Sequence, residues 1–250
     1  MITRLLLMIL ISIPIGNLYS GTIDPNVSDK KYIEYGEQFG YVGKLCGSYE
    51  DGTKFCASAV AIDDHHILTA AHVVQNSKTC TITLDNKEFC IEKVVVHKDF
   101  SDKKFGTADI AIGFSEKPFD LDFYPGLYDS DDEVGKVCCI SGYGITGTFR
   151  SGSINYDNKR RAGSNIIDKT EFDMLICTPS MYGSNKRTSL EFLIASGDSG
   201  GGLFIDNKLA GINSCVMAED KNPNSSYGDE SGHTRISKFI GWIKTNRSKK

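Results

Sequence analysis

The sequence predicts an all-β fold, an antiparallel sandwich or barrel, that ends in one α-helix. From Tyr41 onward, short apolar or alternating runs are separated by turn residues, which is typical of antiparallel strands. Runs with the period of a helix are few before the C-terminal end. The runs that we expect to form strands are residues 57–62, 81–84, 91–97, 110–114, 136–141, 174–178, 202–205 and 208–213.

Two further segments complete this outline. Residues 144–173 are rich in Gly, Asn, Ser and charged side chains, so we expect a surface loop with room for one strand. Near the C-terminus, Ser237 is a suitable N-cap for a helix on which Phe239, Trp242 and Ile243 share one face. We interpret this apolar face as core packing.

Composition and charge restrict the class of protein. The chain has 250 residues, of which 40% are hydrophobic and 24% charged, and its formal net charge is -4. This predicts one globular domain, or two tightly joined halves. A nucleic acid is not an expected partner, because a phosphate-binding surface normally shows clustered Lys and Arg on a basic background. The short basic run at residues 159–161 is interpreted as a solvated loop.

Residues 1–20 have the layout of a secretory signal peptide. One arginine near the start is followed by an apolar run from Leu5 to Ile15, which is too short to span a bilayer as a helix. We expect cleavage near Ser20 and Gly21, and therefore a secreted protein, extracellular or periplasmic, with no membrane partner. The alternative is an anchor that stays uncleaved.

An even number of cysteines in an exported chain predicts disulfides, and no spacing gives the paired C-x-x-C knuckles of a zinc site. We therefore expect no metal and no cofactor. Cys46 and Cys56 are ten residues apart, as are Cys80 and Cys90, so local pairing across hairpins is expected. Three connectivities stay open for the other four, Cys138, Cys139, Cys177 and Cys215.

The stretch SGDSGGG at residues 196–202 places one hydroxyl, that of Ser199, in a run of glycines. A serine is a weak nucleophile until a base accepts its proton, and that base works best when a buried acid orients it. The chain supplies both in the expected order. His72 lies in LTAAHV, and Asp109 begins the apolar run DIAI, where an unpaired carboxylate would be costly to bury.

These three motifs, LTAAHV, DIAI and GDSGG, resemble those of the trypsin-like (chymotrypsin-fold) serine proteases. The resemblance covers about residues 41–244, and weaker matches are CASAVAI, SGYG, LICTPS, LAGINS and GHTRISKFIGWI. It implies two packed antiparallel six-stranded β-barrels, with His72 and Asp109 in the first and Ser199 in the second. The chain would then divide into a signal peptide at 1–20, an N-terminal segment or propeptide at 21–40, and a protease domain at 41–250.

The resemblance assigns roles to individual residues. Ser199 would be the nucleophile, His72 the general base and Asp109 its orienting acid, while the N–H groups of Gly197 and Ser199 would form the oxyanion hole. Ser214 matches a serine that lies behind the catalytic acid in this family, although an ordinary strand hydroxyl is the alternative. The backbone of residues 214–216 would pair with an extended substrate.

In this family the acid at the position of Asp198 pairs with an α-amino group that is freed when a zymogen is cut. This chain lacks the usual Ile-Val-Gly-Gly start, so either a cut within about residues 21–36 supplies the amine or Asp198 has another partner. Val73 stands where the family usually has a cysteine, so the usual bridges cannot all be present. Pairing of Cys56 with Cys46 is expected instead.

Departures from the family pattern suggest which substrate side chain is preferred before the cleaved bond. Leu193 falls at the floor of the substrate pocket, where it offers no counter-charge to a basic side chain. Val216 would narrow the entrance, Gly232 keeps the opposite wall open, and Cys215 replaces a common tryptophan. Together they favour a small or medium apolar residue before the cleaved bond. The alternative is that Leu193 and its neighbour are core residues.

The sequence thus predicts a secreted, monomeric serine endopeptidase that hydrolyses proteins or peptides through an acyl-enzyme. The competing hypothesis is an inactive relative that serves as a binding or scaffolding module, because folds outlive their chemistry. An esterase with a Gly-x-Ser-x-Gly elbow is excluded by order, since its histidine would follow the serine and its serine would lead into a helix. Here His72 precedes Ser199, which leads into a β-like run.

Overall fold

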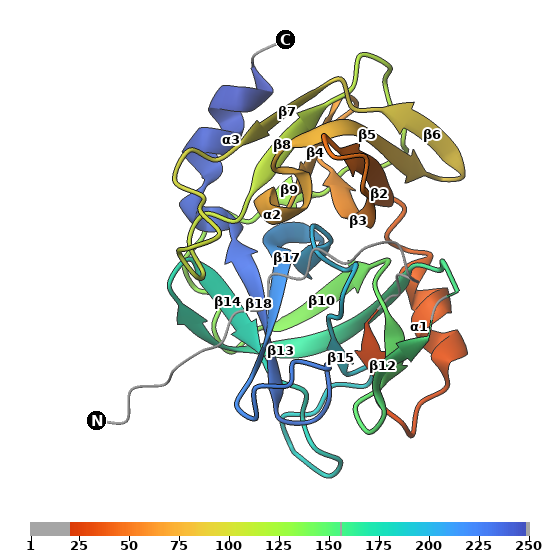
Figure 1. The fold of residues 1–250 in the computed structure, drawn as a ribbon. Coiled ribbons are helices and arrows are strands. Elements are labelled where there is room, and N and C mark those ends of the chain that lie inside the picture. The colour runs from red at the N-terminus through yellow and green to blue at the C-terminus, as the bar shows by residue number, and fades with distance from the viewer. Residues whose placement is uncertain (1–20, 156, 249–250) are drawn as a thin grey trace.

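The structure is a computed structural model that describes residues 21–155 and 157–248. Two barrel-like sheets lie one above the other, and a short helix, α2 (Ala71–Val74), lies near their junction (Figure 1). The predicted signal peptide lies outside the described residues. Within the described ranges, no helix is long and apolar enough to cross a membrane.

The first sheet is built entirely from antiparallel pairs, four between strands consecutive in the chain and two, β2 with β5 and β4 with β8, between strands farther apart. Its core contains the fully buried Leu45, Leu68 and Ile82. In spatial order its strands are β6 (Lys87–Cys90), β5 (Ser77–Leu84), β2 (Val42–Tyr49), β3 (Lys54–Ala61), β4 (His66–Thr69), β8 (Ala111–Phe114) and β7 (Lys93–Val96).

The second sheet has its own core, in which Ile140, Leu175 and Leu203 are fully buried. One end strand, β16, also pairs with β17, and β9 joins β17 in parallel. In spatial order its strands are β16 (Gly202–Ile205), β10 (Val137–Gly142), β13 (Arg161–Glu171), β14 (Met174–Cys177), β18 (Asp229–Arg235), β17 (Lys208–Ala218) and β9 (Gly126–Leu127).

A small third sheet holds the start of the described chain. Its order is β12 (Gly152–Asn155), β11 (Thr146–Thr148), β1 (Thr22–Ile23) and β15 (Phe192–Leu193), with β1 parallel to β11 and antiparallel to β15. Helix α1 (Asp29–Gly36) then packs on β13 and buries Tyr32 completely. The start of the described chain is thus held by the second half of the molecule.

The predicted all-β, two-barrel architecture is confirmed, with seven strands in each main sheet where six were expected. The predicted loop over residues 144–173 is wrong, because it holds β11, β12 and the long β13. Polar side chains of β13 are buried with partners. The guanidinium of Arg161 is 1% exposed and bonds the carboxylates of Asp29 and Asp157, and Asn165 donates to the carbonyl of Phe192.

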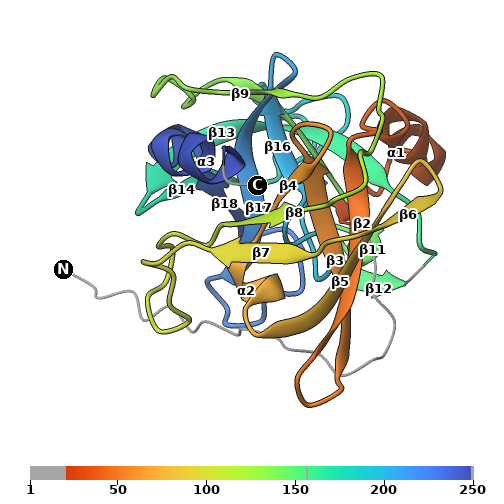
Figure 2. The same ribbon diagram turned by 90° about the horizontal axis from the view of Figure 1, so that it is seen from above.

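The C-terminal helix is confirmed in its packing but not in its cap. A 3₁₀ turn, η1 (Ile236–Lys238), precedes α3 (Ile240–Arg247), and the hydroxyl of Ser237 donates to Glu133 instead of capping the helix. Phe239 and Ile243 are buried as expected, but in the core of the first sheet. Helices α1 and α3 therefore lie on opposite sides of the molecule (Figures 1 and 2).

The cysteines follow the sequence prediction only in part. Cys46 and Cys56 face each other across β2 and β3 and form a disulfide. Cys80 and Cys90 are both free, because the residue opposite Cys90 is Thr81. Successive side chains in a strand point to opposite faces, so Cys80 is buried while Cys90 is exposed. The four cysteines whose pairing stayed open are free thiols.

Candidate active site

Three side chains far apart in the sequence meet where the two main sheets face each other. The Nε2 atom of His72, in α2, lies 3.0 Å from the Oγ atom of Ser199, which is in the turn before β16. The Nδ1 atom of His72 lies 2.8 Å from Oδ2 of Asp109, just before β8. The arrangement forms a continuous hydrogen-bonded chain from carboxylate to hydroxyl.

The carboxylate of Asp109 is held from both sheets. Its Oδ1 accepts the backbone N–H of His72 at 2.9 Å, and its Oδ2 also accepts the hydroxyl of Ser214, in β17, at 2.6 Å. The hydroxyl of Thr234, in β18, donates to the backbone carbonyl of Asp109. These contacts supply the partners that a carboxylate with 8% exposure requires.

Burial and charge act in opposite directions on this pair. Burial tends to lower the pKa of His72, but the charge and the hydrogen bond of Asp109 outweigh it and leave the pKa above its ordinary value. Burial tends to raise the pKa of Asp109, but His72 and Ser214 hold it below its ordinary value. The resting pair is therefore an ionised carboxylate beside an imidazole of increased basicity.

The turn that carries Ser199 requires glycine for two reasons, a left-handed backbone conformation and a close approach of another strand. Gly197 and Gly200 have φ of +90° and +84°, in the left-handed region that favours glycine. At Gly200 a Cβ atom would also collide with the carbonyl of Ser58 and the hydroxyl of Thr69. The N–H groups of Gly197 and Ser199 donate to no other residue in the described part of the chain, so both remain free beside the hydroxyl.

Asp198 is fully buried, and its hydrogen-bond partners include Gly21, the first described residue. Its carboxylate accepts the backbone N–H groups of Gly21 at 2.7 Å, Gly144 at 2.7 Å and Ala195 at 2.9 Å. Burial raises the pKa of Asp198 to about 6, although these amides act to lower it. Gly21 is buried too, and a Cβ atom there would overlap the ring of Phe192.

The residues expected to shape the substrate pocket lie on β15, β17 and β18. Leu193 is fully buried and pairs with Thr22 of β1. Cys215 lies opposite Gly232, and a Cβ atom on Gly232 would come within 2.9 Å of the Cys215 sulfur. Val216 is partly buried against the core of the second sheet. Burial raises the pKa of the Cys215 thiol to about 12, so this thiol stays neutral.

Ser58, in β3, reaches the serine turn but was not identified from the sequence. It is fully buried, and its hydroxyl lies 2.9 Å from the carbonyl of Gly197. A serine within an apolar run resembles an ordinary strand residue, so the weak motif CASAVAI was the only available signal.

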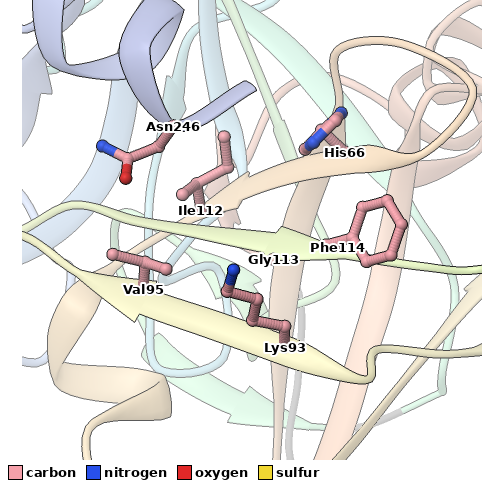
Figure 3. A pocket seen from close by; sticks show the side chains of 7 residues that line it. All are labelled: His66, Lys93, Val95, Ile112, Gly113, Phe114 and Asn246. Atoms are coloured by element: carbon pink, nitrogen blue, oxygen red, sulfur yellow. The ribbon is translucent and has the colours of Figure 1, made fainter. Parts of the chain in front are cut away.

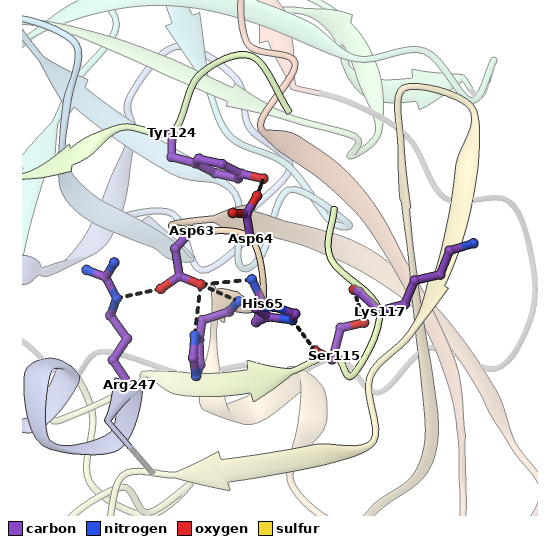
Figure 4. A network of polar contacts seen from close by, with 8 residues as sticks. Asp63, Asp64, His65, Ser115, Lys117, Tyr124 and Arg247 are labelled. Atoms are coloured by element: carbon purple, nitrogen blue, oxygen red, sulfur yellow. Dashed lines mark hydrogen bonds and ion pairs between the residues drawn. The ribbon is translucent and has the colours of Figure 1, made fainter. Parts of the chain in front are cut away.

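One small cavity and one further cluster of polar side chains lie away from this site. A cavity of about 20 Å³, with room for about one water molecule, opens between α3 and strands β7 and β8 (Figure 3). A second cluster is centred on Asp63, which accepts two backbone N–H groups and pairs with His66 and Arg247 (Figure 4). Among the described residues, no three metal-ligating side chains cluster together.

Comparison with known proteins shows the family of this chain. The trypsin family matches residues 36–243 of this chain. The chain belongs to the trypsin family. Chymotrypsin of Phaedon cochleariae is 26% identical over 217 residues, which cover 78% of this chain and 73% of that protein. Chymase of Papio hamadryas is 25% identical over 205 residues, covering 71% and 73%.

Three solved structures share the fold. HL collagenase superimposes with a TM-score of 0.69 at 18% identity, covering 94% of this chain and 100% of that one. Neuropsin, a serine protease from mouse brain, gives a TM-score of 0.66 at 19% identity, covering 84% and 95%. An inactivated protease paralogue of the scabies mite gives 0.65 at 16% identity, covering 86% and 97%.

The dependence of the His72 pKa on Asp109 can be measured directly. In Asp109→Asn, the pKa of His72 should fall, because the negative charge that favours the protonated imidazole is gone while burial remains. The pKa is read from the imidazole proton shifts during an NMR titration. Asp63→Asn, which removes the partner of His66, is the control and should leave His72 unchanged. An unchanged pKa in Asp109→Asn would contradict the coupling.

Proposed function

We propose that this trypsin-family chain is an active, secreted, monomeric serine endopeptidase that acts on proteins or peptides. The observation that carries the proposal is the chain of hydrogen bonds from Asp109 through His72 to Ser199, beside two free backbone amides. Each group has the geometry that acyl transfer requires, with the base within hydrogen-bond reach of both its acid and the nucleophile.

In the proposed reaction, the Oγ atom of Ser199 attacks the carbonyl carbon of the peptide bond while its proton passes to Nε2 of His72. Asp109 keeps the Nδ1–H tautomer oriented and stabilises the imidazolium that forms. The N–H groups of Gly197 and Ser199 bind the negative oxygen of the tetrahedral intermediate. His72 then protonates the leaving amine, and water hydrolyses the acyl-enzyme by the same steps in reverse order.

The competing proposal is an inactive relative that binds without cleaving. The scabies mite paralogue illustrates that the fold by itself does not guarantee activity. In this chain, however, all three residues are present, and His72 lies within hydrogen-bond distance of both Asp109 and Ser199. We therefore favour catalysis.

The catalytic roles are tested by substitution. Ser199→Ala should abolish peptide hydrolysis and labelling by a phosphonylating serine reagent, because it removes the nucleophile. Asp109→Asn should lower kcat by about 10⁴-fold, because the imidazole is held in the wrong tautomer. Ser115→Ala, which removes a buried hydroxyl directly after β8, is the control. Hydrolysis that persists in Ser199→Ala would refute the proposal.

Specificity is proposed to favour a small or medium apolar side chain before the cleaved bond. Leu193 provides no counter-charge, and burying an unpaired cation in an apolar pocket would be costly. Val216 would restrict the entrance, and the sulfur atoms of Cys215 and Met174 fill the space beside Gly232.

A diverse peptide library, analysed by mass spectrometry of the products, measures this preference. We expect cuts after residues such as Ala, Val or Leu, whose side chains need no counter-charge. Cuts after Lys or Arg would contradict this assignment of the pocket. Ser199→Ala run in parallel identifies any cleavage by contaminants.

We also propose that the cut that removes the signal peptide, between Ser20 and Gly21, activates the enzyme. The hydrogen bonds that Asp198 accepts within the described chain come from uncharged amides, so an ammonium at Gly21 would supply the missing charge. Strand β1 and the buried Tyr32 are parts of the fold, which favours keeping residues 21–40 in the active protein. A separately cleaved propeptide, as in a zymogen, is then not needed.

A chain that begins at Gly21 should therefore be more active than one extended by two residues before Gly21. We expect a loss of about 10²-fold, comparable to the loss of an oxyanion donor. The extended form should also lose stability as the pH rises from about 4 to about 6, because the pKa of Asp198 is raised on folding. The Gly21 amine should reduce that loss.

Peptide hydrolysis and thermal unfolding at several pH values measure these two effects. The same two residues added after Lys250 serve as the control. Equal activity of the two N-terminal forms would exclude activation by the amine.

A further inference from the structure

We infer that Ser58 is a positioning residue that holds the oxyanion hole in its active shape, an inference that rests on the proposed function. Ser58 belongs to β3 of the first sheet, whereas the turn that it contacts leads into β16 of the second. The contact therefore crosses the junction between the two halves. No side chain of the proposed catalytic chain makes this contact.

One residue holds the carbonyl groups of both residues whose amides would form the hole. The hydroxyl of Ser58 donates to the carbonyl of Gly197 at 2.9 Å, and its backbone N–H donates to the carbonyl of Ser199 at 2.9 Å. Ser58 thus contacts the turn on either side of Asp198. Its side chain accounts for one of these bonds and its backbone for the other.

The direction of the Ser58 hydroxyl is fixed by a third contact. The backbone N–H of Tyr143 donates to the Oγ atom of Ser58 at 2.9 Å, so a lone pair of this oxygen is occupied. A serine hydroxyl has one proton, and that proton is then free to point at the carbonyl of Gly197. Ser58 is fully buried, so water does not compete for these bonds.

The loop after β10 restrains the same turn through three successive amides. Tyr143 donates to Ser58, Gly144 donates to Asp198, and the N–H of Ile145 donates to the carbonyl of Ser196 at 2.7 Å. The carbonyl of Ser196 and the N–H of Gly197 belong to one planar trans peptide and point in opposite directions. Holding that carbonyl on Ile145 therefore directs the N–H of Gly197 away from the loop.

Gly197 needs this restraint on both sides. With φ of +90° and no Cβ atom, it can change its backbone angles at little cost. The carbonyl of the peptide before it is held by Ile145. In the peptide after it, the Ser58 hydroxyl holds the carbonyl, while the N–H of Asp198 donates to the carbonyl of Ala195. Without that hydroxyl, the buried carbonyl of Gly197 and the N–H of Tyr143 both lose a partner, which favours rotation of the turn toward other partners. An oxyanion hole that rotates no longer meets the developing charge.

The main test substitutes Ser58→Ala in the chain that begins at Gly21. We expect kcat to fall about 10-fold to 100-fold, within the range for loss of an oxyanion donor, with little change in KM. Rates are normalised to active sites titrated with the phosphonylating reagent, so unfolded protein does not contribute. Affinity for a peptide aldehyde, which forms a tetrahedral adduct, should fall in parallel with kcat/KM.

Ser115→Ala is the matched control. Its side chain is also fully buried, directly after β8, and its hydroxyl donates to a backbone carbonyl, that of Lys117, at 2.9 Å (Figure 4). It lies in the cluster away from the site, so it should lower stability without changing kcat or aldehyde affinity. A purely structural role for Ser58 would give the same result as Ser115→Ala.

Ser58→Cys provides a second variant if Ser58→Ala does not fold, because a thiol is similar in size but a weaker donor. It should give an intermediate loss of kcat. Wild-type kcat, within about twofold, in whichever of these variants folds would overturn the inference while leaving the proposed function intact. A wild-type chain without hydrolysis or serine labelling would overturn the proposed function, and this inference with it.

Discussion

The site depends on one buried carboxylate, that of Asp109. Its oxygens accept hydrogen bonds from His72 in the first half of the molecule and from Ser214 in the second. A charge at this depth is tolerated only when its partners are close and well directed, so the position of each half relative to the other is constrained by the same atoms that orient the imidazole. The packing of the two halves and the proposed chemistry therefore depend on the same residue.

The turn that carries Ser199 is likewise held by a buried carboxylate, that of Asp198. The carboxylate of Asp198 accepts N–H groups from Gly21, from the loop after β10 and from Ala195, just before the serine turn. Ser58 adds a contact from the first sheet to that same turn. The carbonyl groups of residues 196–199 all accept hydrogen bonds, whereas the N–H groups of Gly197 and Ser199 have no partner among the described residues. The turn is thus held by bonds that leave free the two amides of the proposed oxyanion hole.

The sequence predicted burial correctly for apolar side chains, because only the core suits them. Phe239 and Ile243 were identified as core because their spacing matches a helix face. It failed where polar residues are buried with distant partners. Arg161 and Asn165 look like loop residues, yet their partners at residues 29, 157 and 192 make β13 a central strand.

The candidate site shows the same division. His72, Asp109 and Ser199 were identified from local motifs, and the structure brings them within hydrogen-bond distance. The contact between Gly21 and Asp198 joins residues 177 positions apart. No local motif predicts it, because the sequence around Gly21 does not match the Ile-Val-Gly-Gly pattern of the family. Cys80 and Cys90 had the right separation for a bridge, but the strand register directs their sulfur atoms to opposite faces.

The first described residues pack with the second half of the molecule, and the C-terminal helix packs with the first half. Strand β1 and Tyr32 complete the second half, whereas Phe239 and Ile243 complete the core of the first. Helix α3 can pack on the first sheet only after residues 239–247 have left the ribosome. Neither half takes all of its core from one contiguous stretch of sequence, so folding depends on long-range contacts, which slow it.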